Sequence, residues 1–332
     1  MIPDSSADLL VFRLSALGDV TLTTGVLEYL AKERGGGFHF LTRQAYAPVL
    51  MNNPHIEKIV VPDESGLKGA AWLKTASNLA RHYDGWELLD LHGSLRSMIL
   101  RRFWKGPVHI YPKMRLARRI FDKTKLAAAR ERLNRYNVPQ RYALALMNEA
   151  PDALDLKPRI YLTEDEINAA SSKLSDIGID RPAVALHPYA THEAKAWPRE
   201  HWLKLIELLD AKGLDWFVVG RTKAEALLDD NPRDLTFETD IRQTCALLQA
   251  SSALVTNDSG PMHLATAVNT RVIALFGPTH RAWGFFPSGE NDVVLERDMK
   301  CRPCHLHGGR GCRKGEECLR AISPQEVLEA IS

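Results

Sequence analysis

The chain has 332 residues, of which 45% are hydrophobic and 25% charged, as in globular proteins generally. This length suits two α/β domains better than one. The sequence has no unbroken apolar run of about 18 residues, which excludes a membrane-spanning helix. The polar, acidic start, Met1–Asp8, does not resemble a secretory signal, so we expect a cytoplasmic protein.

The net charge of +2 conceals a division along the chain. Residues 1–150 carry 22 basic and 14 acidic side chains, whereas residues 151–332 carry 21 and 27. Residues 96–141 alone hold 14 basic and two acidic side chains. A solvated helical face and a surface for a polyanion both fit this pattern, and the one-sided imbalance favours the polyanion. Nucleic acid is the weaker candidate, because few aromatic residues lie between the basic ones.

The first half alternates apolar runs with helical patterns. Leu9–Leu14 predicts a buried strand, and a turn containing Gly18 and Asp19 leads from it into a helix that ends near Lys32. No GxGxxG follows this strand, which argues against a dehydrogenase. Further strands are expected at 38–41, 56–61, 86–91 and 108–111, with helices at 67–81, 95–104, 114–135 and 142–149.

The second half repeats the alternation. Ala150–Arg159 contains two prolines and no steady period, which indicates a linker. We therefore predict domains at 1–155 and 156–332, each a doubly wound α/β sheet. Strands are expected at 183–186, 215–219, 253–255 and 272–276, with helices at 164–177, 200–211, 240–250 and 262–268.

The stretch Ala253–His280 predicts a strand, a polar turn, a helix and a second strand. The turn Asp258-Ser259-Gly260 comes where the first strand ends, and ligands bind at that edge of an open parallel sheet. The first amides of a helix have no partner inside the helix, and a phosphate can supply one. A capped helix without a ligand is the alternative interpretation.

Several segments match one family in order and spacing. They are LVFRLSALGDV at 10–20, DLHGSLRS at 90–97, KAWPREHW at 195–202, NDSGPMHLA at 257–265, FGPT at 276–279 and the tail from Cys301 to Val327. Across nearly its whole length the chain resembles glycosyltransferase family 9, the ADP-heptose:lipopolysaccharide heptosyltransferases. The resemblance implies a GT-B fold, with two Rossmann-like domains facing across a cleft. The N-terminal domain would bind the acceptor and the C-terminal domain the nucleotide-sugar, in an inverting reaction that needs no metal or other cofactor.

The resemblance assigns the catalytic base to Asp19, in the Gly-Asp of the first loop. An inverting transfer needs a base that takes the proton of the acceptor hydroxyl as this attacks the anomeric carbon. A carboxylate at a helix N-terminus is also a plausible cap, which is the structural alternative.

The resemblance also assigns the donor site. Lys195 would bind phosphate, Asp258 the hydroxyls of the transferred sugar, and Glu225 the nucleoside, while an Asx turn and a solvated lysine are the structural alternatives. His263 fits a structural role as well as a ligand contact. Pro261 has no N–H, so other amides of its turn must serve as donors. The full predicted donor-binding set is Thr191, Lys195, Glu225, Asp258, Ser259, Gly260, Met262 and His263.

The basic first half suits an acceptor rich in carboxylates and phosphates, such as the lipopolysaccharide inner core with its lipid A. Arg13, Arg96 and Arg115 are the predicted acceptor-binding residues. Because that acceptor is carried on a membrane, we also expect peripheral contact with the anionic inner face of the inner membrane.

Four cysteines near the end of the chain have the pattern C-x2-C-x7-C-x5-C, at Cys301, Cys304, Cys312 and Cys318, with His305 and His307 between them. In a cytoplasmic protein this spacing indicates a structural zinc site more than a disulfide framework. Reduced or incidentally oxidised thiols are the alternative.

The first hypothesis is therefore heptose transfer from ADP-heptose to the lipopolysaccharide inner core. A second hypothesis keeps the fold but assigns another nucleotide-sugar or glycan acceptor, because no residue in the sequence specifies heptose directly. A third is a non-catalytic, polyanion-binding homologue.

Overall fold

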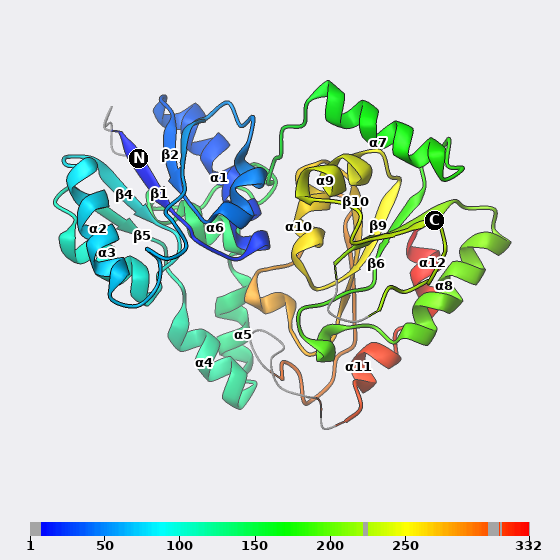
Figure 1. Ribbon diagram of the computed structural model, residues 1–332. Coiled ribbons are helices and arrows are strands. Elements are labelled where there is room, and N and C mark those ends of the chain that lie inside the picture. The colour runs from blue at the N-terminus through cyan, green and yellow to red at the C-terminus, as the bar shows by residue number, and fades with distance from the viewer. Residues whose placement is uncertain (1–7, 222–224, 305–311, 313, 332) are drawn as a thin grey trace. The chain divides into compact units, whose positions relative to one another are not determined.

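The structure is a computed structural model that describes residues 8–221, 225–304, 312 and 314–331. The chain divides into two compact units (Figure 1). Unit 1 comprises the described residues of Met1–Lys113 and Val138–Tyr161, and unit 2 those of Met114–Asn137 and Leu162–Ser332. This division differs from the expected single boundary after residue 155, because residues 114–137 group with unit 2. Most of the acidic start, Met1–Asp8, lies outside the described residues.

Unit 1 contains one parallel sheet of five strands in the order β3-β2-β1-β4-β5. β1 is buried along its whole length, as expected for the central strand of a sheet with helices on both faces. The strands are β1 (Leu9–Phe12), β2 (Phe38–Leu41), β3 (Ile56–Val60), β4 (Glu87–Asp90) and β5 (Val108–Ile110).

Helices cover both faces of this sheet (Figure 1). One face is covered by α2 and α3, whose Trp72 and Leu100 are buried against Phe12 and Leu88 in a single apolar cluster. The other carries α1 and α6, which pack against each other. The helices are α1 (Leu17–Arg34), α2 (Ala71–His82), α3 (Leu95–Phe103) and α6 (Val138–Ala143), with the 3-10 helix η1 (Gln44–Leu50).

The predicted linker packs closely against α1. Leu156 is fully buried, and the Arg159 N–H donates a hydrogen bond to Thr24 Oγ1 at 2.9 Å. A Cβ at Gly25 would lie 2.1 Å from the carbonyl oxygen of Lys157, so only glycine allows this approach. Ala150–Arg159 therefore forms part of unit 1 instead of a free connection.

Unit 2 contains a parallel sheet of six strands in the order β11-β10-β9-β6-β7-β8. Numbered within the unit this is 6-5-4-1-2-3, the doubly wound order of a dinucleotide-binding fold. The strands are β6 (Val184–His187), β7 (Trp216–Gly220), β8 (Asp234–Thr236), β9 (Ala253–Asn257), β10 (Arg271–Phe276) and β11 (Val293–Glu296).

Two groups of helices cover this sheet (Figure 1). On one face, Trp202 of α8 and Val327 of α12 are buried against Val255 and Ile273. On the other, α9 packs against α7 and α10. The remaining bounds are α7 (Glu164–Asp176), α8 (Arg199–Ala211), α9 (Ile241–Gln249), α10 (Gly260–Ala267), α11 (Glu317–Arg320) and α12 (Pro324–Ile331), with the 3-10 helices η2 (Glu193–Lys195) and η3 (Arg281–Trp283).

The basic segment of residues 114–137 forms α4 (Arg115–Thr124) and α5 (Ala127–Asn134) instead of one helix. Lys125, between them, has a left-handed backbone conformation that ends α4. Phe121 packs edge-on against Trp283 of η3, with ring centroids 5.5 Å apart. This contact explains why the segment groups with unit 2. The prediction of a helix at 142–149 was also wrong, because the helix in this region, α6, spans Val138–Ala143.

None of the helices in the described part of the chain is both long enough and apolar enough to span a bilayer.

Candidate functional site

The predicted base and the predicted phosphate-binding and sugar-binding residues follow the carboxyl ends of central strands. In unit 1 the strand order reverses between β1 and β4, and in unit 2 between β6 and β9. Crevices at such reversal points are where open α/β sheets bind ligands. Asp19 follows β1, and Asp258 follows β9. Each unit thus presents one candidate site.

In unit 1 the Asp19 carboxylate is held from three sides. Its Oδ2 lies 2.6 Å from Arg13 Nη2 and accepts the Ala16 N–H at 3.2 Å. Its Oδ1 accepts the Tyr142 hydroxyl at 3.0 Å. The side chain is 19% exposed, so it remains accessible to a substrate. The bond to Ala16 shows that Asp19 also caps α1, so its structural role and a catalytic role are compatible.

Arg13 and Tyr142 surround this carboxylate with buried donors. Arg13 Nε donates to the carbonyl oxygen of Ser15 at 2.7 Å, and Nη1 donates to that of Leu91. Burial alone would disfavour the guanidinium charge, but Asp19 and the tyrosines raise the pKa of Arg13 above its usual value. Burial raises the pKa of Tyr142 well above its usual value, so this hydroxyl stays protonated and donates to Asp19.

His92, in the loop after β4, belongs to the same site and was not predicted. Burial lowers its pKa to about 3, and the charges of Arg13 and Lys113 act in the same direction. A neutral imidazole next to the Arg13–Asp19 pair adds no further charge. Its position in the DLHGSLRS segment was a usable signal, because that segment follows the strand adjacent to β1.

In unit 2, Lys195 and Asp258 form a direct ion pair. Lys195 Nζ lies 2.7 Å from Asp258 Oδ2, and their side chains are 15% and 13% exposed. The same carboxylate oxygen accepts the Thr279 hydroxyl at 2.6 Å. Three segments matched by the resemblance therefore meet at one point. Thr279 was predicted only as part of FGPT, without a role of its own.

Asn257 fixes the loop that carries Lys195. Its Oδ1 accepts the Trp197 N–H at 2.9 Å, and its Nδ2 donates to the carbonyl oxygen of Pro188 at 2.8 Å. Asn257 is fully buried at the end of β9. Its two hydrogen bonds hold the loop after β6 beside the turn that begins α10, which places Lys195 next to Asp258.

Ser259 precedes α10 but does not cap it through its side chain. Its hydroxyl instead lies 3.2 Å from Thr256 Oγ1 and 3.3 Å from His187 Nδ1. Burial lowers the pKa of His187 to about 4, so the imidazole is neutral at neutral pH. The Ser259 side chain therefore does not cap α10, and the choice between a bound anion and a helix without a ligand stays a prediction. The first amides of α10 are suited to an anion.

The other predicted donor residues differ in exposure. Met262 and His263 are buried in α10, so a ligand would meet the Met262 amide and not its side chain. Gly260 is half-buried, and Thr191 and Glu225 are exposed. Glu225 follows residues 222–224, which lie outside the described residues.

The predicted acceptor residues do not all lie in unit 1. Arg96 is exposed at the start of α3, and its Nε donates to the carbonyl oxygen of Leu67 at 2.8 Å. Arg115 is exposed in the first turn of α4 and thus belongs to unit 2. Arg13 forms an ion pair with Asp19. A role for each in acceptor binding stays a prediction.

The four tail cysteines are free thiols in the structure. Burial raises the pKa of Cys304 to about 11, and the neighbouring Cys301, Cys312 and Cys318 act in the same direction. This influence shows that the four thiols share one region. Within the described residues, however, no three His, Cys, Asp or Glu side chains are grouped to hold a metal ion. His305 and His307 lie outside the described residues.

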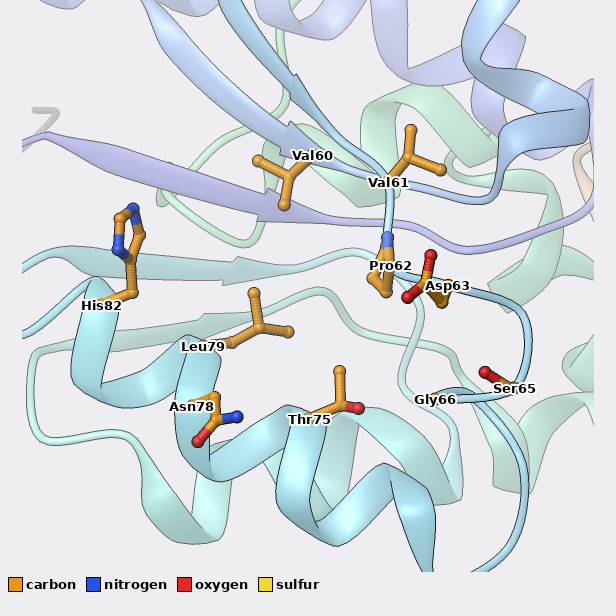
Figure 2. A pocket seen from close by; sticks show the side chains of 10 residues that line it. All are labelled: Val60, Val61, Pro62, Asp63, Ser65, Gly66, Thr75, Asn78, Leu79 and His82. Atoms are coloured by element: carbon orange, nitrogen blue, oxygen red, sulfur yellow. The ribbon is translucent and has the colours of Figure 1, made fainter.

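A surface pocket of unit 1 lies between the end of β3 and α2 (Figure 2). None of the predicted site residues lines it. The lining residues are Val60, Val61, Pro62, Asp63, Ser65, Gly66, Thr75, Asn78, Leu79 and His82.

Comparison with known proteins identifies the family. The model of "Glycosyltransferase family 9 (heptosyltransferase)" matches residues 72–310, more than half of the chain. The chain belongs to glycosyltransferase family 9. This confirms the resemblance, and the matched region contains Lys195 and Asp258.

Curated relatives of this family 9 chain carry heptosyltransferase names. It is 35% identical over 229 residues to lipooligosaccharide heptosyltransferase 2 of Haemophilus influenzae, which covers 60% of this chain and 64% of that protein. It is 30% identical over 212 residues to lipopolysaccharide heptosyltransferase 2 of Escherichia coli K12, covering 58% of each. The chain thus spans less than two thirds of the length of these relatives.

Solved structures confirm the fold over the whole length. A family 9 glycosyltransferase from Veillonella parvula superposes with a TM-score of 0.74 at 18% identity, covering 98% of this chain and 96% of the other. ADP-heptose lipopolysaccharide heptosyltransferase II of Escherichia coli gives a TM-score of 0.69 at 22% identity, with 98% and 97% coverage. With its two doubly wound parallel sheets, the family 9 chain has the predicted GT-B fold.

Proposed function

We propose that this protein is an inverting glycosyltransferase that moves heptose from ADP-heptose to the lipopolysaccharide inner core. The observation that carries the proposal is the Asp19 carboxylate, fixed by Arg13 and Tyr142 yet still accessible, in a chain of family 9. A carboxylate that is held by hydrogen bonds and is still accessible to a substrate hydroxyl suits a general base.

In the proposed reaction, unit 1 supplies the base and unit 2 holds the donor. An acceptor hydroxyl attacks the anomeric carbon of heptose and forms the new C–O bond while the bond to the diphosphate oxygen breaks. The hydroxyl proton passes to Asp19, and the electron pair of the broken bond leaves with ADP. Attack from the face opposite the leaving group inverts the anomeric configuration.

The departing diphosphate gains negative charge, and unit 2 offers fixed positive groups for it. Lys195 supplies a cation, and the amides that begin α10 supply oriented dipoles. These groups can neutralise the leaving group, so we propose that transfer requires no metal. Asp258, at the same point, could accept hydroxyls of the sugar, while its bond to Lys195 holds both side chains in place.

Incubation with ADP-heptose and defined truncated core acceptors, read by mass spectrometry, tests the proposal. A mass gain of one heptose and release of ADP are expected. ADP-glucose and UDP-sugars serve as parallel donors, because a different donor is the nearest rival. Transfer from none of these donors would leave the non-catalytic, polyanion-binding hypothesis.

The acceptor in this proposal is attached to a lipid. We therefore also propose that the protein works in the cytoplasm at the inner face of the inner membrane, in peripheral contact with its anionic surface. A preference for lipid-bound over oligosaccharide acceptor in the same assay would support this placement, and equal use of both would argue against it.

Tyr142 gives a test in the pH dependence. Its hydroxyl stabilises the ionised form of Asp19, the form a base needs, and this stabilisation is lost in Tyr142→Phe. Activity falls when acid protonates the base, so the acidic limb of the kcat/KM profile should move to higher pH in this variant. At neutral pH the rate should fall less than about ten-fold, since one hydrogen bond contributes about 1 kcal/mol. An unchanged limb would contradict the role of Tyr142.

Although the four tail cysteines, which all lie within the described residues, are not grouped to hold a metal ion in the structure, we propose that they bind a structural metal outside the reaction. Four thiols are a suitable donor set for zinc. A solved glycosyltransferase of enterotoxigenic Escherichia coli, similar in fold with a TM-score of 0.60 and 14% identity, is described as iron-containing, so iron should be measured as well. We expect about one metal per chain after purification under reducing conditions, lost in Cys301→Ser. Metal-free protein with full activity would end this proposal.

A further inference from the structure

Helix α4 exposes apolar side chains to solvent. Leu116 is 71% exposed and Ile120, one turn later, 37%, while Leu126, in the turn before α5, is 53% exposed. An adjacent side of α4 carries Ala117 and Phe121, which are buried against Ala282 and Trp283. The helix is thus anchored to unit 2 by one face. Another face exposes large aliphatic side chains to water, and this exposure is unfavourable in free energy unless a partner covers them.

Basic side chains lie near this aliphatic ridge, the exposed side chains of Leu116, Ile120 and Leu126. Arg119 and Lys123 are exposed on α4, and Arg130 and Arg132 on α5. None of these four forms an ion pair with another described residue. Their positive charge is therefore available to an external partner.

Two other basic residues of the segment serve the fold instead. Arg118 donates to the carbonyl oxygen of Trp283 at 3.3 Å and lies over the ring of Phe285. Lys125 Nζ donates to the carbonyl oxygens of Asp122 and Pro303. The segment thus separates inward-facing cations that fix it to unit 2 from outward-facing cations that do not.

From this separation we infer that α4 and the turn after it dock on an anionic bilayer surface. Leu116, Ile120 and Leu126 enter the boundary between headgroups and acyl chains, and Arg119 and Lys123 meet lipid phosphates. An amphipathic helix with aliphatic residues flanked by cations is the pattern of interfacial membrane binding. A nucleic acid would use the cations but not the aliphatic ridge, and the exposed face has no aromatic residue for base stacking.

This inference gives a surface to the membrane contact included in the proposed function, and it rests on that contact but not on catalysis. Vesicle binding needs neither Asp19 nor Lys195. Vesicle binding can therefore be absent while heptose transfer to a soluble acceptor is normal. The opposite result, vesicle binding without transfer, can be distinguished from it.

The test is sedimentation of the full-length protein with phosphatidylcholine vesicles, with and without phosphatidylglycerol. Binding is expected only to the anionic vesicles, and it should weaken with salt. Leu116→Gln with Ile120→Gln should lower the partition coefficient about ten-fold. Arg119→Glu with Lys123→Glu should lower it about 25-fold or more, since each basic group near such a surface contributes about 1 kcal/mol.

Leu154→Gln is the matched control. Leu154 is 53% exposed, like Leu126, but stands between Asp152 and Asp155, so its replacement should leave partitioning unchanged. Circular dichroism and transfer to a soluble acceptor should show all variants folded. The wild-type protein failing to bind anionic vesicles would overturn the inference, as would glutamine variants that bind like wild type. Complete displacement by a soluble phosphorylated core oligosaccharide would also overturn it, by assigning the cations to the acceptor.

Discussion

Asp19→Asn should lower kcat for heptose transfer about 10²- to 10⁴-fold, the range that general-base catalysis contributes. The amide has the shape of the carboxylate but cannot take the acceptor proton. Its single oxygen can still accept the Ala16 N–H, which keeps the cap of α1, and its NH2 group can then donate to the Tyr142 hydroxyl, so the start of α1 should remain intact. Steady-state kinetics with ADP-heptose and a truncated core acceptor measures the effect.

Two controls separate catalysis from folding. ADP should bind Asp19→Asn with wild-type affinity by calorimetry, because the proposed donor residues belong to unit 2. Glu57→Gln removes an exposed carboxylate of β3 in the same unit and should leave kcat unchanged. Wild-type turnover in Asp19→Asn would remove Asp19 as the base. The sugar-transfer mechanism would then need another carboxylate.

The buried strands and their following turns could be predicted because both signals are local. A short apolar run with a polar turn after it identifies β1 and β9, and the parallel order then brings loop residues to one sheet edge. The Lys195–Asp258 pair follows from that topology together with the family resemblance. Asp19 was predicted in the same way; its bond to Ala16 confirms the helix-cap role, and its role as the base stays a prediction.

What could not be predicted depends on contacts between distant residues. Tyr142 reaches Asp19 across 123 positions of sequence, and no local pattern marks a tyrosine of α6 as a donor to that carboxylate. The placement of α4 and α5 in unit 2 depends on Phe121 meeting Trp283, which a basic helical pattern does not indicate. For the same reason, Arg115 was expected in the acceptor domain from its sequence position alone.

Lys195→Met should lower kcat about 10²- to 10³-fold, the effect typical of removing one group that stabilises developing negative charge. Methionine keeps much of the aliphatic stem and removes only the cation. Affinity for ADP should fall more than affinity for adenosine, because adenosine has no phosphate to meet the ammonium group. Calorimetry with ADP, AMP and adenosine measures this difference. Lys204→Met, at an exposed lysine of α8, is the control and should change none of these values.

A structural role for Lys195 makes a different prediction. If Lys195 only balances the charge of Asp258, then its removal leaves a largely buried carboxylate beside the Thr279 hydroxyl and without its cation. In that case Asp258→Asn should relieve the defect, and the double variant should regain ADP affinity. If Lys195 binds the diphosphate, the double variant should bind ADP no better than Lys195→Met. A double-mutant cycle on ADP affinity therefore decides between charge balance within unit 2 and recognition of the leaving group.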